Sequence, residues 1–180
     1  MHKELFVEIE IPDGVEANLE GNNFTIKGKE GELKRKFYAP SLEFKIEKNK
    51  IIVGNKNSTK REKKMMNTIT AHLKNMIKGV QKKFEIKLKI CFAHFPITVV
   101  VQGEIALIKN FLGEKNPRKC KIRKGAEVEV KGQEIIVKAI DREIAGQTAA
   151  NFEKATWIRM RDRRVFQDGI FITNKAGKEM

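Results

Sequence analysis

The sequence has few of the residues that a disulfide scaffold or a metal centre needs. Its 180 residues include two cysteines, Cys91 and Cys120, which form no C-x-x-C pair and cannot staple a chain of this length. The three histidines stand in no spacing typical of metal ligands, so the sequence predicts no metal and no other cofactor. This composition fits a reducing compartment such as the cytoplasm.

Long hydrophobic runs are also absent. No window approaches the roughly 18 uncharged apolar residues of a membrane span. The first twelve residues alternate acidic and apolar side chains, which is unlike a signal peptide. We therefore expect neither a membrane protein nor a secreted one.

Motifs for catalysis have little support. The segment Gly28-Lys29-Glu30-Gly31 lacks the third glycine of a dinucleotide-binding fingerprint and lies between predicted strands instead of opening a helix. Glu8 and Glu10 alternate along a predicted strand and are most simply its solvated face. The sequence thus predicts a protein that is not an enzyme and has no small-molecule substrate.

What the sequence has in excess is positive charge. Lysine and arginine number 37 against 23 acidic residues, which gives a formal net charge of +14. The residues up to Val80 hold 16 basic and 11 acidic side chains, and those from Gln81 hold 21 and 12, so the net charges are +5 and +9. A field of this sign favours polyanions, nucleic acid above all, with an acidic membrane surface or an acidic protein as alternatives.

Short segments with a two-residue period dominate the first half and are typical of half-buried strands. They cover residues 5–11, 24–26, 33–37, 44–46 and 51–53. From Ser58 or Thr59 the period changes to three and four residues, which predicts a helix. Ser58 and Thr59 are the candidate N-caps, Thr59 and Glu62 have the spacing of a capping box, and Gly79 is expected to end the helix.

The second half repeats this order of elements. Strand-like segments cover residues 84–90, 97–101, 105–107, 120–122, 128–130 and 135–137. A helix follows, with Asp141 as its N-cap. The triplet Ile51-Ile52-Val53 recurs as Ile135-Ile136-Val137, and Gly21 before a strand has a counterpart in Gly103.

These repeats indicate an internal duplication. We predict an α+β fold of two tandem duplicated domains, residues 1–81 and 82–180. Each is expected to be a small, mostly antiparallel β-sheet covered by one α-helix. Domains of this size bury little surface on their own, so we expect them to lean on each other or on a partner.

A run of cations without an acid lies between residues 115 and 124. It contains Asn116-Pro117, and we interpret it as a flexible loop between two strands, a shape suited to lying along a phosphate backbone. A solvated loop is the alternative, although solvated surfaces normally mix both signs of charge. The cations are Lys115, Arg118, Lys119, Lys121, Arg123 and Lys124.

Two further clusters are basic. Residues 159–167 interleave arginines with apolar and aromatic side chains, a pattern that suits gripping phosphates or stacking on bases. At the start of the first predicted helix, cations stand where the helix dipole prefers acids, and a partner anion or a plain solvated face explains them equally well. These cations are Lys56, Lys60, Arg61, Lys63 and Lys64.

Three segments carry a resemblance to a known family. Residues 141–151 (DREIAGQTAAN) and 162–171 (DRRVFQDGIF) look like the C-terminal signature of large-subunit ribosomal protein six in its archaeal and eukaryotic form. The opening strand, residues 7–14 (VEIEIPDG), is similar to that family as well. The order of elements agrees with the family over the whole chain.

The resemblance implies a two-domain structural constituent of the large ribosomal subunit, in the cytoplasm and without catalytic activity. It implies binding to large-subunit ribosomal RNA near the stalk base and the sarcin–ricin loop, beside other ribosomal proteins. The second domain and its basic tail are expected to be the main RNA-binding part. A basic protein–protein adaptor that contacts acidic stalk-associated proteins is the alternative.

Candidate RNA-binding residues come from the basic clusters and from the family signature. The Gly146-Gln147 step would bring the chain close to the partner, whereas close packing of the helix on its sheet is the other explanation for Gly146. For Ala149 and Ala150 we favour packing. The candidates are Lys115, Arg118, Lys119, Lys121, Arg123, Gln147, Asn151, Arg159, Arg161, Arg163, Arg164, Lys175 and Lys178.

Overall fold

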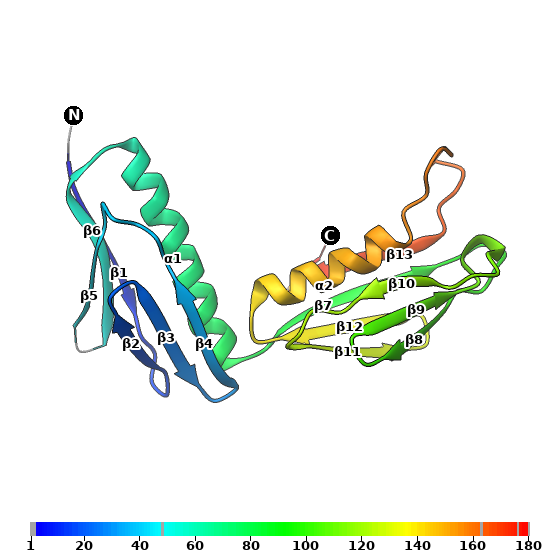
Figure 1. The fold of residues 1–180 in the computed structure, drawn as a ribbon, viewed down its shortest axis with the longest axis horizontal. Helices are drawn as coiled ribbons and strands as arrows, with labels where there is room; N and C mark the ends of the chain where they lie inside the picture. Colours follow the sequence, from blue (N-terminus) through cyan, green and yellow to red (C-terminus); the bar gives the residue numbers. More distant parts are fainter. Residues whose placement is uncertain (1–2, 48, 163, 176, 180) are drawn as a thin grey trace. The chain divides into compact units, whose positions relative to one another are not determined.

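The computed structural model describes residues 3–47, 49–162, 164–175 and 177–179, and Figure 1 shows its fold. The chain divides into two compact units, unit 1 from Met1 to Lys83 and unit 2 from Phe84 to Met180. Each unit combines antiparallel strands with one long helix. The α+β class and the tandem arrangement expected from the sequence are confirmed.

The described residues of unit 1 form six strands and one helix. They are β1 (Lys3–Glu10), β2 (Glu16–Glu20), β3 (Asn23–Gly28), β4 (Gly31–Lys36), β5 (Glu43–Glu47), β6 (Lys50–Ser58) and α1 (Lys60–Gln81). The strands form two antiparallel sheets with the orders β1-β6-β5 and β2-β3-β4, and α1 contacts both. Their apolar side chains share one core, in which the ring of Phe24 meets those of Phe37 and Phe44 edge to face, with ring centroids 5.6 and 5.2 Å apart.

Unit 2 has a longer list of elements. They are β7 (Phe84–Cys91), β8 (Thr98–Gln102), β9 (Ile105–Lys109), the 3-10 turn η1 (Phe111–Gly113), β10 (Arg118–Lys121), β11 (Ala126–Lys131), β12 (Glu134–Ala139), α2 (Arg142–Ala155), β13 (Gly169–Lys175) and β14 (Lys178–Glu179). The sheets have the orders β8-β9-β10 and β11-β12-β7-β13-β14. Phe111 and Phe152 are fully buried between them and α2.

Both units share one plan of strand pairing. In unit 2, β7, β12 and β11 pair in the same order as β1, β6 and β5, and β8-β9-β10 corresponds to β2-β3-β4. The helix follows the sixth strand in both. Gly21 and Gly103 occupy the matching hairpin turns with φ of 62° and 60°, a left-handed conformation that glycine adopts without strain. This shared pairing is what a duplication produces.

Unit 2 adds one feature to this plan. Strand β13 pairs with the free edge of β7 and is followed by the short strand β14. In the described part of unit 1, no strand pairs with the corresponding edge of β1. The tail therefore closes one sheet edge in unit 2 that stays open in unit 1.

Both predicted helix starts are confirmed. The Glu62 carboxylate accepts the N–H of Thr59 at 2.9 Å, and the Thr59 hydroxyl accepts the N–H of Arg61 at 3.3 Å. Hydrogen bonds from Thr59 also lower the pKa of Glu62. At α2, the Asp141 carboxylate accepts the N–H of Glu143 at 2.8 Å. These contacts satisfy backbone donors that a helix leaves open at its first turn.

Three details differ from the sequence-based expectations. Each unit has two sheets around its helix instead of one, because alternation reveals strands without revealing their partners. The alternation does not reveal β2, in which Leu19 is the one large apolar residue. Gly79 does not end α1, since the helix continues to Gln81. Val80 in that last turn is fully buried, and its carbonyl accepts the N–H of Glu30 at 2.9 Å.

Gly54 on β6 is a position where a side chain has no room. A Cβ atom there would collide with the ring of Phe6 and the carbonyl oxygen of Leu5 on the neighbouring strand β1. We expect Gly54→Ala to lower the free energy of unfolding by about 1–3 kcal/mol, as overpacking of a filled site does. Urea denaturation followed by circular dichroism measures this, and a variant as stable as the wild type would contradict the close β1–β6 pairing.

Candidate nucleic-acid interface

Strand β10 presents a row of cations to solvent. Its side chains alternate between two faces: Lys119 and Lys121 are exposed, as is Arg123 two residues further on, whereas Cys120 and Ile122 are buried. Residues two apart on a strand lie on the same face about 6.6–6.8 Å from each other. No carboxylate of the described residues forms an ion pair with any of these three cations. We call Lys119, Lys121 and Arg123 the β10 row.

Side chains of α2 hold the β10 row in place. The amide of Asn151 donates to the carbonyl of Lys121 at 2.8 Å, and the hydroxyl of Thr148 accepts the N–H of Arg123 at 3.4 Å. The amide of Gln147 in turn donates to the side-chain oxygen of Asn151 at 2.9 Å. The structure thus brings Gln147 and Asn151 beside the row, with Gln147 exposed and Asn151 used to fix the strand.

Arg118 is committed to internal contacts. Its guanidinium forms two hydrogen bonds with the Glu114 carboxylate, at 2.6 and 2.8 Å, and lies over the ring of Phe111 at 4.3 Å from the centroid. It also donates to the carbonyls of Ala155 and Trp157 at 3.0 and 3.3 Å. The hydrogen bond from Arg118 lowers the pKa of Glu114. This arginine clamp ties the start of β10 to the end of α2.

The interpretation of residues 115–124 as a flexible loop is wrong. Residues 118–121 form β10, which pairs antiparallel with β9, for example Lys119 opposite Leu107. The strand expected over residues 120–122 captures only the end of β10, because the inward face begins with the charged Arg118 before Cys120 and Ile122. A strand held on both sides gives its cations fixed positions that a loop would not.

Two arginines of the tail are attached to their own segment, between α2 and β13. The guanidinium of Arg161 lies over the ring of Phe166, 4.7 Å from its centroid. Arg164 forms an ion pair with Asp162 at 2.9 Å, and this hydrogen bonding lowers the pKa of Asp162. Both arginines remain exposed to solvent.

The remaining candidates lie outside the β10 row. Arg159 is exposed on the tail, and Lys115 is exposed in the turn before β10. Lys175 and Lys178 are exposed on the β13–β14 hairpin, which belongs to a different sheet from β10. Arg163 lies outside the described residues.

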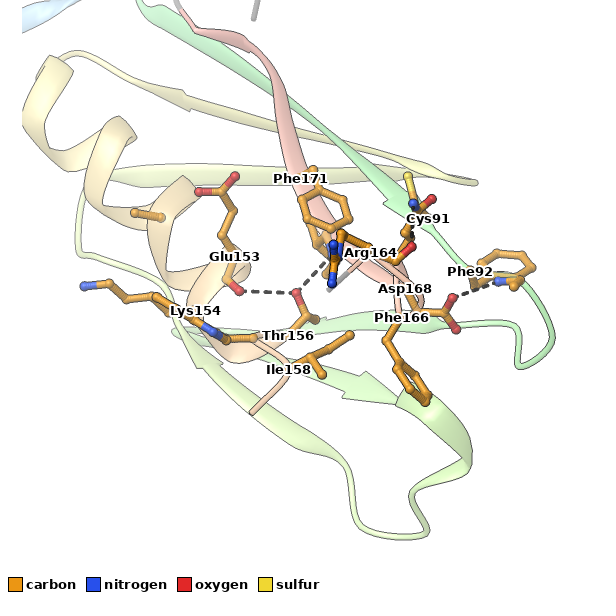
Figure 2. A pocket seen from close by; sticks show the side chains of 15 residues that line it. Cys91, Phe92, Glu153, Lys154, Thr156, Ile158, Arg164, Phe166, Asp168 and Phe171 are labelled. Carbon is orange, nitrogen blue, oxygen red and sulfur yellow. Dashed lines mark hydrogen bonds between the residues drawn. The ribbon is translucent and has the colours of Figure 1, made fainter. Parts of the chain in front are cut away.

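A hollow of about 830 Å³ lies between the end of α2, β13 and the tail segment, as Figure 2 shows. Three of its polar side chains are bound to backbone groups. The hydroxyl of Thr156 and the carboxylate of Glu153 each accept an N–H of β13 at 3.0 Å, and the Asp168 carboxylate accepts the N–H of Ala93 at 3.1 Å. These groups fold the tail back onto unit 2.

Groups suited to catalysis are few in the described part of the chain. No cluster of three or more histidine, cysteine, aspartate or glutamate side chains there could hold a metal ion. Burial raises the pKa of the Cys120 thiol to about 12, which keeps it protonated. In the same residues, no helix has the length and apolar character needed to cross a membrane.

Known proteins are similar to this chain over almost its full length. The family described as Ribosomal protein L6 matches residues 11–83 and 95–169. Large ribosomal subunit protein uL6 of Methanosarcina mazei is 46% identical over 176 residues, 98% of this chain and 100% of that protein. The proteins of the same name from Methanococcus vannielii and Methanobrevibacter smithii are each 46% identical, over 95% and 93% of this chain and 94% of their own lengths. The chain belongs to the ribosomal protein L6 family.

Membership of the ribosomal protein L6 family confirms several expectations. The relatives are proteins of archaeal species, in agreement with the archaeal and eukaryotic form of the family that the sequence resembles. The chain is a structural ribosomal protein of the large subunit, located in the cytoplasm, and not an enzyme. The two matched segments fall one in each unit, in agreement with the duplicated fold.

Net charge does not distinguish the two units of this L6-family protein. Lys82 and Lys83 belong to unit 1, which therefore holds 18 basic and 11 acidic residues, against 19 and 12 in unit 2. Each unit carries a net charge of +7. The net charges of +5 and +9 result from dividing the chain before Lys82 and Lys83. Net charge therefore does not indicate which unit binds RNA, whereas the positions of the cations do.

The arginine clamp predicts that Arg118 stabilises unit 2. Arg118→Ala removes a two-pronged ion pair, two hydrogen bonds to carbonyls and a cation–π contact, and it leaves Glu114 without its partner. We expect the free energy of unfolding to fall by about 2–3 kcal/mol. Lys119→Ala, one residue along on the exposed face, is the matched control and should change stability by no more than about 0.5 kcal/mol. Equal stability of the two variants in urea denaturation would rule out the clamp.

Proposed function

We propose that this L6-family protein binds large-subunit ribosomal RNA through the β10 row and the adjoining face of α2. The observation that carries the proposal is the β10 row itself. Its three cations form no ion pair with any described residue, and hydrogen bonds from α2 hold the backbone that carries them. Lysine and arginine at such positions neutralise phosphates and release the counterions condensed on the RNA. Sequence-independent contacts of this kind place a structural protein on its RNA.

Rigidity of the β10 row supports this role. Asn151 and Thr148 fix the backbone at Lys121 and Arg123, so the row needs little further ordering when RNA binds. Arg123 adds a planar fork that contacts two phosphate oxygens at once, whereas the lysines act as point charges. The sequence analysis gave Arg118 as an RNA-binding candidate together with the three residues of the row. We assign it a supporting role, because its contacts anchor the start of the strand.

The equivalent strand of unit 1 shows a different arrangement. On β4 the exposed positions are Glu32, Lys34 and Lys36, and the ammonium of Lys34 lies 3.1 Å from the Glu32 carboxylate. The Glu32 carboxylate repels phosphates and forms an ion pair with Lys34, so this lysine is less available to an anionic partner. The same place in the duplicated fold therefore mixes both signs of charge in unit 1 and is purely cationic in unit 2.

Helix α2 has an open position at Gly146, which at 100° per residue lies about 140° around the helix from Asn151 and therefore away from the β10 row. No atom lies within 4 Å of the Cβ that a side chain would add there, so packing inside unit 2 does not require glycine. Ala149 is fully buried, which agrees with its expected packing role. A glycine in mid-helix costs stability, and a partner that approaches the helix backbone would explain a glycine at this position.

For the position on the ribosome we propose the stalk base near the sarcin–ricin loop, beside neighbouring ribosomal proteins. The family signature in residues 141–151 and 162–171 supports this placement. The tail also has large apolar side chains that are mostly exposed to solvent, Trp157, Met160 and Val165. Apolar side chains of this size suit contacts with a neighbouring macromolecule.

A salt titration tests the β10 row. The variant Lys119→Gln/Lys121→Gln/Arg123→Gln removes three phosphate contacts, so the slope of log K against log salt should flatten by roughly 2–3. The probe is large-subunit ribosomal RNA transcribed in vitro. Circular dichroism should show an unchanged fold, because all three side chains are exposed.

Chemical footprinting of the same RNA locates the contact. Wild-type protein should protect nucleotides of the sarcin–ricin region and the stalk base, and the triple variant should not. Protection elsewhere would overturn the placement but not RNA binding. An unchanged salt slope in the triple variant would overturn the proposed interface, and retention on acidic stalk proteins but not on RNA after a salt wash would favour the adaptor function.

Gly146→Ala separates stability from binding. The change should raise the free energy of unfolding by about 0.5–1 kcal/mol, because alanine is the better helix former and has room. We expect it to lower affinity for the RNA roughly tenfold, equivalent to about 1.4 kcal/mol, because the methyl group keeps the backbone away from its partner. Urea denaturation and filter binding measure the two effects. Unchanged affinity would mean that nothing approaches the helix at this point.

A further inference from the structure

The solvent face of α1 carries most of the positive charge of unit 1. The helix holds six cations and a single acid, Glu62, which gives +5 of the unit's net charge of +7. All six cations are exposed. They are Lys60, Arg61, Lys63, Lys64, Lys74 and Lys78.

The five lysines form one stripe along the helix. At 100° per residue their positions fall within an arc of about 100°, on the side opposite the buried residues such as Ile69 and Leu73. From Lys60 to Lys78 the stripe is about 27 Å long. Between its two ends the exposed positions are uncharged, for example Asn67 and Ala71, so no acid interrupts it. We call these five side chains the lysine stripe.

Four lysines on the sheets of unit 1 form ion pairs, whereas the described lysines of the stripe form none. On the sheets, Lys34 lies 3.1 Å from Glu32 and Lys50 lies 2.8 Å from Glu8. No described carboxylate forms an ion pair with a lysine of the stripe. The carboxylate of Glu62, the single acid of the helix, accepts a hydrogen bond from the backbone N–H of the N-cap residue Thr59. The acids of unit 1 are thus segregated from the helix.

This arrangement works against the stability of the helix. Lys60 and Lys64 stand four residues apart, as do Lys74 and Lys78, and like charges at this spacing repel. Lys60, Lys63 and Lys64 also stand in the first turns, where the helix dipole disfavours cations. Ordinary solvated faces mix both signs and avoid these costs. A polyanion bound along the stripe offsets both.

We infer that the lysine stripe of α1 is a second RNA-binding surface, which lies along a phosphate backbone without reading base sequence. The inference rests on the proposed function, because it takes the chain to be an RNA-binding protein, and it extends binding to unit 1. Protein–protein interfaces are poor in lysine and rich in aromatic and apolar anchors, and the stripe offers no such anchor. Lysine is suited to phosphates as a mobile point charge.

The duplicated fold therefore uses different layers for the same chemistry. In unit 2 the helix α2 is charge-balanced, with Arg142 and Lys154 against Glu143 and Glu153, and the β10 row lies on the sheet. In unit 1 the strands together are charge-balanced and the lysine stripe lies on the helix. Each unit thus presents a cationic surface that contains no acid.

The test compares matched neutralisations in the full-length chain. Lys64→Gln/Lys74→Gln/Lys78→Gln removes three charges from the stripe with a residue that keeps helix propensity. Lys27→Gln/Lys34→Gln/Lys45→Gln removes three charges from the sheets of the same unit, where the lysines lie near Glu32 and Glu43. Salt titrations use large-subunit ribosomal RNA transcribed in vitro, with circular dichroism and thermal unfolding as fold controls.

We expect the stripe variant to flatten the salt slope by roughly 2–3 and the sheet variant to leave it unchanged. The melting temperature of the stripe variant should stay the same or rise, because like-charge repulsion is relieved. A stripe variant with the wild-type slope, beside a β10-row variant that flattens it, would overturn this inference and leave the proposed function standing.

Two further outcomes are informative. If the stripe variant flattens the slope and the β10-row variant does not, the stripe is upheld and the proposed interface on unit 2 fails. If the stripe variant keeps its RNA slope but loses binding to polyglutamate, the surface serves an acidic protein and the inference is overturned. An equal loss from the stripe and sheet variants would show a general effect of charge and would overturn it as well.

Discussion

Burial of Cys120 and Ile122 beneath α2 fixes which side chains β10 can present. A strand places successive residues on opposite faces, so two buried positions force Lys119, Lys121 and Arg123 outward. The bonds from Asn151 and Thr148 then set the position of this row relative to the helix. The cationic face of unit 2 is therefore a consequence of how its core packs, because the buried positions and the bonds from α2 already fix where these charges lie.

The duplication separates the frame of each unit from its surface chemistry. Strand pairing is the same in both units, and buried residues at matching places, such as Ile51 on β6 and Ile135 on β12, are retained. The exposed positions have no such constraint, because a surface side chain contributes little to stability. Cations could thus accumulate on β10 in one copy and on α1 in the other while the fold stayed the same.

The sequence predicted what depends on local pattern. Both helix starts, the strands with strong alternation and the repeat between Ile51 and Ile135 follow from spacing alone. It did not predict the second sheet of each unit, because strand pairing is a long-range property. It also did not predict that Arg118 points inward. An arginine that stacks on Phe111 and binds Glu114 cannot be told apart, from sequence alone, from one that is free to bind a phosphate. Composition alone overrated the charge difference between halves, because net charge carries no information about which cations are already paired.

The open edge of β1 has a consequence for the protein before it joins a ribosome. In unit 2 the strand β13 covers the matching edge of β7, whereas no strand of the described residues pairs with that side of β1. An uncovered strand edge is a template for pairing with another chain. The exposed side chains of β1 include Glu4 and Glu10, which form no ion pair among the described residues and would repel the same strand of a second copy. Unit 1 thus guards against self-association by electrostatic repulsion at this edge, while unit 2 relies on a covering strand.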